Sequence, residues 1–280
     1  MNDARDSGYM ESHVSGFHLS DEIVTVANRL VNPTVEEFHS KCGRVIRTAL
    51  DEVIDMPRSG RFSLDQLEKT EKTYVGTKVE ILFRHEFGFP KGVKLDLLIS
   101  GIEVDVKNTV RSNWTIPREA VGEICILLRS DDNKSRFSAG LLRCSLENLN
   151  AGQNQDKKRT IGERGRERIL WLIKDGDLPV NFFLQMDSEI RSYIFEAVGT
   201  ERIARLFLKN IGIPIKREII KMAAQQEDYM KRVRGNGGAR DIVEALGFEI
   251  LYGYFTDQKE RAASLGFEDL GKNEFICLKT

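Results

Sequence analysis

Apolar residues recur at three- and four-residue spacing from Pro33 to about Asp55, which predicts an amphipathic helix. A second helical pattern runs from Leu64 to about Phe87 and ends before a turn-forming cluster at 88–92. The later part of the chain is also mainly helical in pattern. Its expected helices span residues 165–174, 188–198, 200–209, 214–228, 239–246 and 257–265, with a β-like run at 248–255.

Between the two helical regions, the spacing of apolar residues changes from three or four residues to two. Residues 93–99 and 102–107 alternate polar and apolar side chains, and Ser100-Gly101 lies between them. This pattern predicts a β-hairpin with a two-residue turn. Residues 123–129 and 137–143 are two further strand candidates, and 117–121 is a short helix candidate.

A shift to Asn, Gly, Gln and Lys after residue 148 suggests a linker. The predicted organisation has a polar tail (1–20), an α/β domain (21–148), a linker (149–162) and a mainly helical domain (163–280).

The composition is that of a water-soluble globular protein, with 41% hydrophobic and 30% charged residues among 280. No apolar run reaches the roughly 18–20 residues that cross a bilayer, and the first residues lack a signal-peptide pattern. The four cysteines are widely spaced and form no metal or redox motif. We therefore expect a cytoplasmic protein without a membrane partner.

Positive charge is concentrated in one segment, although the net charge is only −1. Residues 201–240 hold ten Lys and Arg against four acidic residues. A local positive field attracts a polyanion even when the whole chain is neutral. A solvated helix face accounts for the same run of charge.

The predicted hairpin places two acidic side chains opposite each other. A two-residue turn at 100–101 pairs Asp96 with Asp105, with Lys107 on the same side. Like charges that face each other destabilise a strand pair, so a cation bound between the two carboxylates would stabilise the hairpin. Carboxylate oxygens are ligands that suit Mg²⁺. Two carboxylates with a metal ion and a lysine also suit phosphodiester hydrolysis. An exposed hairpin face with a surface ion pair accounts for the same spacing.

Glu80, on the helix before the hairpin, is a candidate third carboxylate. Spacing alone does not favour it over Glu71 or Glu86, and each of the three also suits a surface position.

These residues resemble a known signature. Asp96, eight intervening residues and Asp105-Val106-Lys107 resemble the D-x-K variant of the PD-(D/E)xK nuclease superfamily, although Leu95 stands where its proline is common. Glu80, sixteen residues before Asp96, and the strand-turn-strand pattern at 129–143 resemble the NaeI-like type IIE restriction endonucleases.

The resemblance implies a mixed sheet with flanking helices, followed by a winged-helix, CAP-like domain. It implies a homodimeric, Mg²⁺-dependent endonuclease that cuts both strands of double-stranded DNA at a palindromic site and is activated by a second DNA copy. By position, Glu80, Asp96, Asp105 and the Val106 carbonyl would bind metal, and Lys107 would serve the attacking water.

The basic segment supplies candidate DNA contacts. Residues 200–225 have helix-turn-helix proportions, and the second helix would present Lys216, Arg217 and Lys221 to DNA. Arg232 and Arg234 lead towards the wing candidate at 248–255. Two packed helices with charged outer faces are the alternative.

Two other functions fit the same residues. The first is a DNA-binding regulator without catalysis, and the second is a DNA-repair nicking endonuclease of the same superfamily. A regulator has no need of opposed carboxylates on an apolar hairpin, so Asp96, Asp105 and Lys107 favour an enzyme.

Overall fold

A computed structural model describes residues 20–280, so the predicted polar tail lies outside the described residues apart from Ser20. The chain forms two compact units. The first contains the described residues up to Val53 together with Leu67–Asn181, and the second contains Ile54–Gln66 and Phe182–Thr280.

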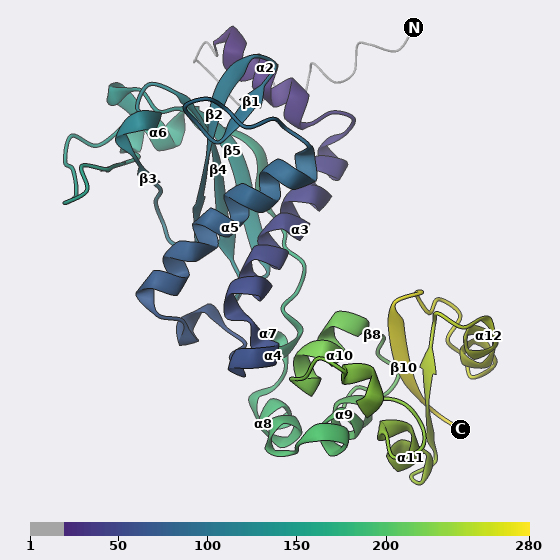
Figure 1. The fold of residues 1–280 in the computed structure, drawn as a ribbon. Coiled ribbons are helices and arrows are strands. Elements are labelled where there is room, and N and C mark those ends of the chain that lie inside the picture. Colours follow the sequence, from purple (N-terminus) through teal and green to yellow (C-terminus); the bar gives the residue numbers. More distant parts are fainter. Residues whose placement is uncertain (1–19) are drawn as a thin grey trace, which may run out of the picture. The chain divides into compact units, whose positions relative to one another are not determined.

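The first unit is built on a five-stranded mixed sheet in the order β1-β2-β4-β5-β7 (Figure 1). Its strands are β1 (Leu97–Ile99), β2 (Ile102–Thr109), β4 (Ile124–Asp131), β5 (Arg136–Arg143) and β7 (Leu170–Asp177). Strands β2 and β4 are parallel, and the other neighbouring pairs are antiparallel. The prediction of an α/β domain with a mixed sheet and flanking helices is confirmed.

Two long helices cover one face of this sheet, α3 (Val35–Ile54) and α5 (Lys69–Phe87) (Figure 1). They lie side by side, with the Phe38 and Phe87 ring centroids 5.6 Å apart. Helix α3 contacts β5 through His39 and Phe137, whose ring centroids are 5.1 Å apart. Helix α5 is continuous through its middle. Its C-terminal cap is Gly88, which has a φ of 65°, a left-handed conformation that glycine adopts without strain.

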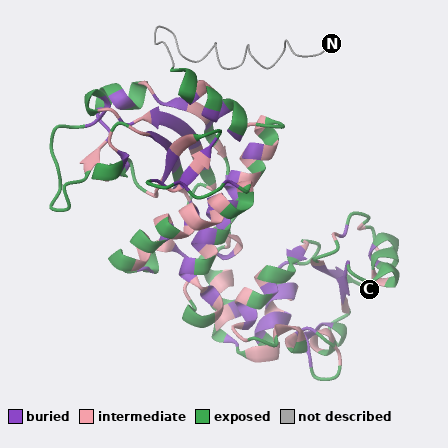
Figure 2. Cartoon of the chain, turned by 45° about the horizontal axis from the view of Figure 1, so that its top comes forward, coloured by how far each residue is buried: buried purple, intermediate pink, exposed green. Residues whose placement is uncertain are grey.

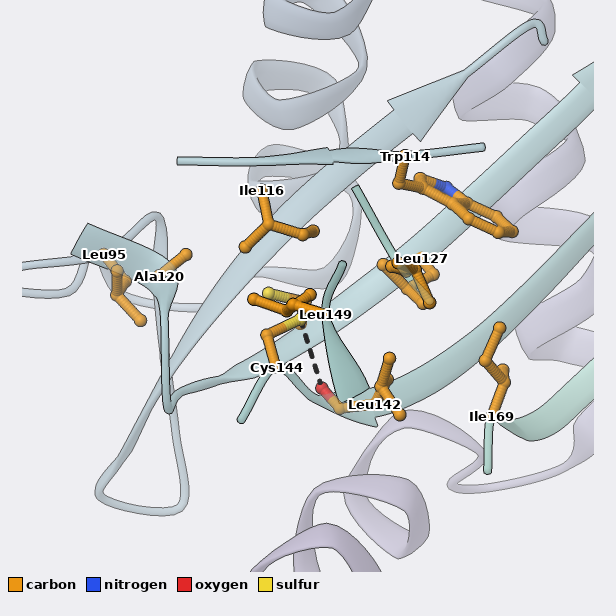
Figure 3. Close-up of a cluster of buried hydrophobic side chains, with 11 residues drawn as sticks. Leu95, Trp114, Ile116, Ala120, Leu127, Leu142, Cys144, Leu149 and Ile169 are labelled. Carbon is orange, nitrogen blue, oxygen red and sulfur yellow. Dashed lines mark hydrogen bonds between the residues drawn. The ribbon is translucent and has the colours of Figure 1, made fainter. Parts of the chain in front are cut away.

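Smaller elements surround the sheet. An apolar cluster covers the face of the sheet that α3 and α5 leave free. These elements are α2 (Asp21–Leu30), β3 (Thr115–Ile116), η2 (Arg118–Ala120), η3 (Leu146–Asn148), β6 (Arg159–Thr160) and α6 (Glu163–Glu167). The cluster packs Trp114 and Ile116 against Leu127 and Leu142 of the sheet (Figure 3). The buried strands between these two layers are visible in Figure 2.

The second unit combines short helices with a three-stranded antiparallel sheet in the order β8-β10-β9. Its helices are α4 (Met56–Ser59), η1 (Leu64–Gln66), α7 (Phe182–Gln185), α8 (Ser188–Glu196), α9 (Gly199–Leu208), α10 (Arg217–Ala224), η4 (Tyr229–Arg232), α11 (Ala239–Glu244) and α12 (Thr256–Ser264). Its strands are β8 (Ile215–Lys216), β9 (Phe248–Tyr252) and β10 (Glu274–Lys279).

The division between the units differs from the predicted linker. Residues 149–162 belong to the first unit, where Ile161 is fully buried and β6 pairs with β3. Only the start of the helix expected at 165–174 is helical, in α6, and its second half is strand β7, because the apolar run from Leu170 to Ile173 pairs with β5 at the sheet edge. Such a short run fits either period. The first sheet therefore extends to Asp177.

The helix-turn-helix expected at 200–225 also differs in detail. Helix α9 forms where expected, but Ile215 and Lys216 form strand β8 before α10 begins. Ile215 is fully buried and pairs with Phe275 of β10, a strand that the sequence pattern did not predict.

In the part of the chain that the structure describes, no helix has both the length and the apolar character needed to cross a membrane.

Candidate active site

The hairpin of β1 and β2 forms in the predicted register. Leu97 pairs with Val104 and Ile99 with Ile102, across a turn in which Ser100 and Gly101 have φ of 50° and 82°. Positive φ at both central residues is characteristic of a turn that matches the twist of two strands. Asp96 precedes the first paired residue of β1 directly.

Strand β2 continues past the point where β1 begins, so its outer edge is open beyond Val104. Asp96 contacts this open edge, where its Oδ2 accepts a hydrogen bond of 2.8 Å from the Val106 N–H. The carbonyl of a strand residue points to the same side as its own N–H. The Val106 carbonyl therefore faces the open edge, where it accepts a 3.2 Å hydrogen bond from Lys107 Nζ.

Asp105 and Lys107 project from the same face of β2. Lys107 Nζ lies 2.8 Å from Asp105 Oδ2 and 3.8 Å from Asp96 Oδ2. Asp105 is only 3% exposed and is aligned with the buried Cys125 of β4. A buried carboxylate is costly without a partner. The Lys107 ammonium supplies that partner.

Glu80 reaches the same site from helix α5. Its neighbours Val79 and Phe83 are fully buried and anchor this turn of the helix. The Glu80 carboxyl group lies close enough to Asp96 for the two groups to interact, and this interaction raises the pKa of Glu80. The structure therefore brings together Glu80, Asp96, Asp105 and Lys107, all four side chains of the predicted catalytic set.

The three carboxyl groups have different affinities for protons. Burial raises the pKa of Glu80 to about 7, and its hydrogen bond to Asp96 acts in the same direction. Burial, followed by a hydrogen bond to Asp96, likewise raises the pKa of Asp105 to about 7. Burial opposes ionisation of Asp96, but hydrogen bonds from Asp105 and the Val106 N–H hold its pKa below the usual value.

Lys107 stays charged in this environment. Burial lowers its pKa, but the charge of Asp105, the hydrogen bond to Asp105 and the charge of Asp96 together raise the pKa overall. At neutral pH the site therefore combines one ionised carboxylate, one ammonium group and two carboxyl groups that exchange protons readily.

The chemistry of these donors fits a divalent cation. Among the described residues, no three His, Cys, Asp or Glu side chains are preassembled as a metal site. The Lys107 ammonium instead supplies positive charge beside the aspartates. Carboxylate and carbonyl oxygens are the ligands that Mg²⁺ prefers, and protons on Glu80 and Asp105 are exchangeable for such an ion.

Glu103 is a further residue beside this site, and the sequence pattern alone did not single it out. Its carboxylate accepts hydrogen bonds from the N–H groups of Val93, Lys94 and Leu95. Those of Leu95 and Val93 contribute most to holding its pKa below the usual value. The alternation that places Glu103 on the same face as Asp105 was the available signal.

Two residues near the site face the interior of the first unit. Trp114 is buried in the apolar cluster of Figure 3, and its Nε1 donates a 2.8 Å hydrogen bond to the Leu128 carbonyl. Asn113 Nδ2 donates to the Ile161 carbonyl at 2.9 Å. Core packing thus accounts for Trp114.

The candidate DNA contacts all lie in the second unit. Lys216 in β8 and Arg217 and Lys221 in α10 are exposed. Arg217 donates to the Tyr229 hydroxyl and its guanidinium lies over the Tyr229 ring. Arg232 Nε donates to Gln226 Oε1 at 2.9 Å, and Arg234 is exposed.

The mixed sheet, with Asp105 and Lys107 on β2, Asp96 just before β1 and Glu80 on the neighbouring helix α5, is consistent with a nuclease-like fold. The family model described as "Restriction endonuclease NaeI" matches residues 31–280. A relative from Lentzea aerocolonigenes, the "Type II restriction enzyme NaeI", is 36% identical over 244 residues, which are 84% of this chain and 76% of the relative. The chain belongs to the NaeI family of restriction endonucleases.

Proposed function

We propose that this protein is a Mg²⁺-dependent type II restriction endonuclease that hydrolyses both strands of DNA at a palindromic site. One observation carries the proposal. Asp96, Asp105, Glu80 and Lys107 come from three separate segments and meet at the open edge of β2. Such a group serves phosphodiester hydrolysis, whereas a purely structural hairpin does not need it.

In the proposed mechanism, Glu80, Asp96, Asp105 and the Val106 carbonyl hold the metal. When bound, Mg²⁺ polarises a phosphate oxygen and lowers the pKa of a water molecule. Lys107 Nζ donates a hydrogen bond to the attacking water and offsets the charge that develops on the phosphate. Its contact with Asp105 fixes the lysine for this role.

A cleavage assay on a long DNA of known sequence tests the proposal. We expect discrete double-strand fragments with Mg²⁺ and none with EDTA, and mapping of their ends would give the recognition site. Nicked circles from a supercoiled plasmid would instead favour a repair endonuclease. Tight DNA binding without strand cleavage would favour a regulator.

We further propose that the second unit is a winged-helix DNA-binding domain. The order α9, β8, α10, η4, α11, β9, α12, β10 and the sheet order β8-β10-β9 support this proposal. They place helices α9 and α10 before the antiparallel strands β9 and β10, which α12 connects. The exposed Lys216, Arg217 and Lys221 would contact phosphates, together with Arg232 and Arg234.

The family also suggests a homodimer and activation by a second DNA copy, which two experiments address. Sedimentation equilibrium should give twice the chain mass of 31.9 kDa. Addition of a short duplex that contains the site should accelerate cleavage of a plasmid with a single site. A monomer, or a rate unaffected by the duplex, would contradict the corresponding proposal.

A further inference from the structure

The segment before Asp96 is held by an acidic side chain rather than by strand pairing. Three consecutive N–H groups donate to one carboxylate, from Val93 to Glu103 Oε1 at 2.6 Å, and from Lys94 and Leu95 to Oε2 at 3.2 and 2.8 Å. Successive N–H groups of this kind form an anion-binding concavity. Here the anion belongs to the protein itself.

Glu103 lies two residues before Asp105 on β2, and alternation places both side chains on one face. The strand that carries Asp105 therefore also holds the segment that ends at Asp96. Val93 is 99% exposed, whereas Leu95 is buried in the apolar cluster of Figure 3. Packing therefore anchors the segment at Leu95, and the bonds to Glu103 fix the backbone of residues 93–95.

The space around the Glu103 carboxylate is closely fitted. A Cβ atom at Gly92 would collide with Glu103 Oε2 and would lie 2.7 Å from the Leu95 carbonyl oxygen. Glycine is thus required at position 92 for space. A second tie comes from Lys94, whose Nζ lies 2.7 Å from Glu123 Oε1, just before β4.

We propose that Glu103 is a positioning residue that sets the separation of the Asp96 and Asp105 carboxylates by fixing residues 93–95. Ionised acceptors form the stronger class of hydrogen bonds, and loss of a group that orients a metal ligand typically lowers metal affinity by about 10–100-fold. The proposal rests on the proposed function, because it concerns the same metal ligands.

The main test substitutes Glu103→Gln, which keeps the shape of the side chain. An amide nitrogen cannot accept a hydrogen bond, so this variant loses either the bond from Val93 or those from Lys94 and Leu95, according to which oxygen the nitrogen replaces. Hydrogen exchange of the Val93, Lys94 and Leu95 amides should accelerate in the metal-free protein. Gly92→Ala, which displaces the carboxylate without removing its charge, should produce the same change. Glu119→Gln, a charge-matched change at an exposed position of the same unit, should leave these amides unaffected.

Metal binding is measured directly with Mn²⁺, by the loss of the free-ion electron paramagnetic resonance signal. We expect the Glu103→Gln protein to bind Mn²⁺ about 10–100-fold more weakly than the wild type, with the Glu119→Gln protein unchanged. In cleavage assays, the Mg²⁺ concentration that gives half-maximal cleavage by the Glu103→Gln protein should rise by a similar factor. Its rate at saturating Mg²⁺ should stay within a few-fold of the wild-type rate. General destabilisation would lower the saturated rate instead.

The outcomes separate the two proposals. Equal Mn²⁺ affinity of the wild type and the Glu103→Gln protein would overturn the positioning role, even if the amides exchange faster, while wild-type cleavage with Mg²⁺ would still support the proposed function. A wild type that binds Mn²⁺ without cleaving DNA would overturn the proposed function, and the Mn²⁺ comparison would still decide the role of Glu103. A wild type that neither binds Mn²⁺ nor cleaves DNA would overturn both.

Discussion

The Lys107 ammonium lies 2.8 Å from the Asp105 carboxylate, two residues away on the same face of β2. The same nitrogen lies 3.8 Å from Asp96 Oδ2. The lysine thus supplies the positive charge that opposed carboxylates need when no metal ion is present. This contact explains how a metal-free protein can hold two acidic side chains at the edge of an apolar sheet.

Replacement of Lys107 by Ala should reduce cleavage by about 10²–10⁴-fold, because the site loses its hydrogen-bond donor to water and to the transition state. DNA binding in Ca²⁺, measured by fluorescence anisotropy, should stay within a few-fold of the wild type. Asp105→Ala should show the same separation of cleavage from binding. Substantial cutting by either variant would remove these residues from the proposed mechanism.

The proton affinities of Glu80 and Asp105 predict a strong pH dependence of metal binding. Both carboxyl groups have pKa values near 7, so protons compete with Mg²⁺ at lower pH. At limiting Mg²⁺ the cleavage rate should rise steeply with pH up to about 7 and then level off. At saturating Mg²⁺ the rise should shift to lower pH. A profile that does not depend on Mg²⁺ concentration would contradict the assignment of these groups as ligands.

Much of this site could be predicted from the sequence because its information is local. The alternating pattern and the Ser100-Gly101 turn fix the hairpin register, and the register brings Asp96 to Asp105. Glu80 could not be selected over Glu71 or Glu86 by spacing, because its role depends on how α5 packs on the sheet. Only the resemblance to the family distinguished it.

Other features were beyond sequence reasoning because they depend on distant partners. Strand β7 pairs with β5, and residues 144–169 separate the two strands, so its short apolar run could not be distinguished from a helix by period alone. The predicted strand at 93–99 is shortened to Leu97–Ile99 because the N–H groups before it bind a side chain, Glu103, instead of a strand.

The raised pKa values of Glu80 and Asp105 should make the metal-free protein less stable as pH rises. The pKa of Glu80 is 4.5 for the free side chain and about 7 in the folded protein, so the folded state binds more protons between these values. Stability therefore falls as pH increases through this range. Glu80→Gln should remove the part of this stability loss that Glu80 causes. We expect the variant's Tm to be about 2–4 °C higher than that of the wild type at pH 8, with little difference at pH 5.

Differential scanning calorimetry in EDTA measures this effect, with Glu119→Gln as the charge-matched control. Addition of Ca²⁺ should raise the Tm of the wild type more at pH 8 than at pH 5, because ligand binding to the folded state stabilises it. If the Glu80→Gln protein is instead less stable than the wild type at pH 8, the ionised Glu80 carboxylate stabilises the folded protein, and the prediction is wrong.

The basic start of α10 predicts a change in the salt dependence of DNA binding. Each phosphate contact contributes about 0.9 to the slope of log affinity against log salt concentration. Replacement of both Lys216 and Arg217 by Ala should therefore lower the slope by about 2 and weaken binding at low salt, as measured by anisotropy titrations over a range of NaCl concentrations. Lys259 and Arg261 on α12 provide a control pair of equal charge in the same unit. An unchanged slope in the first variant, or an equal fall in the control, would show that α10 makes no specific phosphate contact.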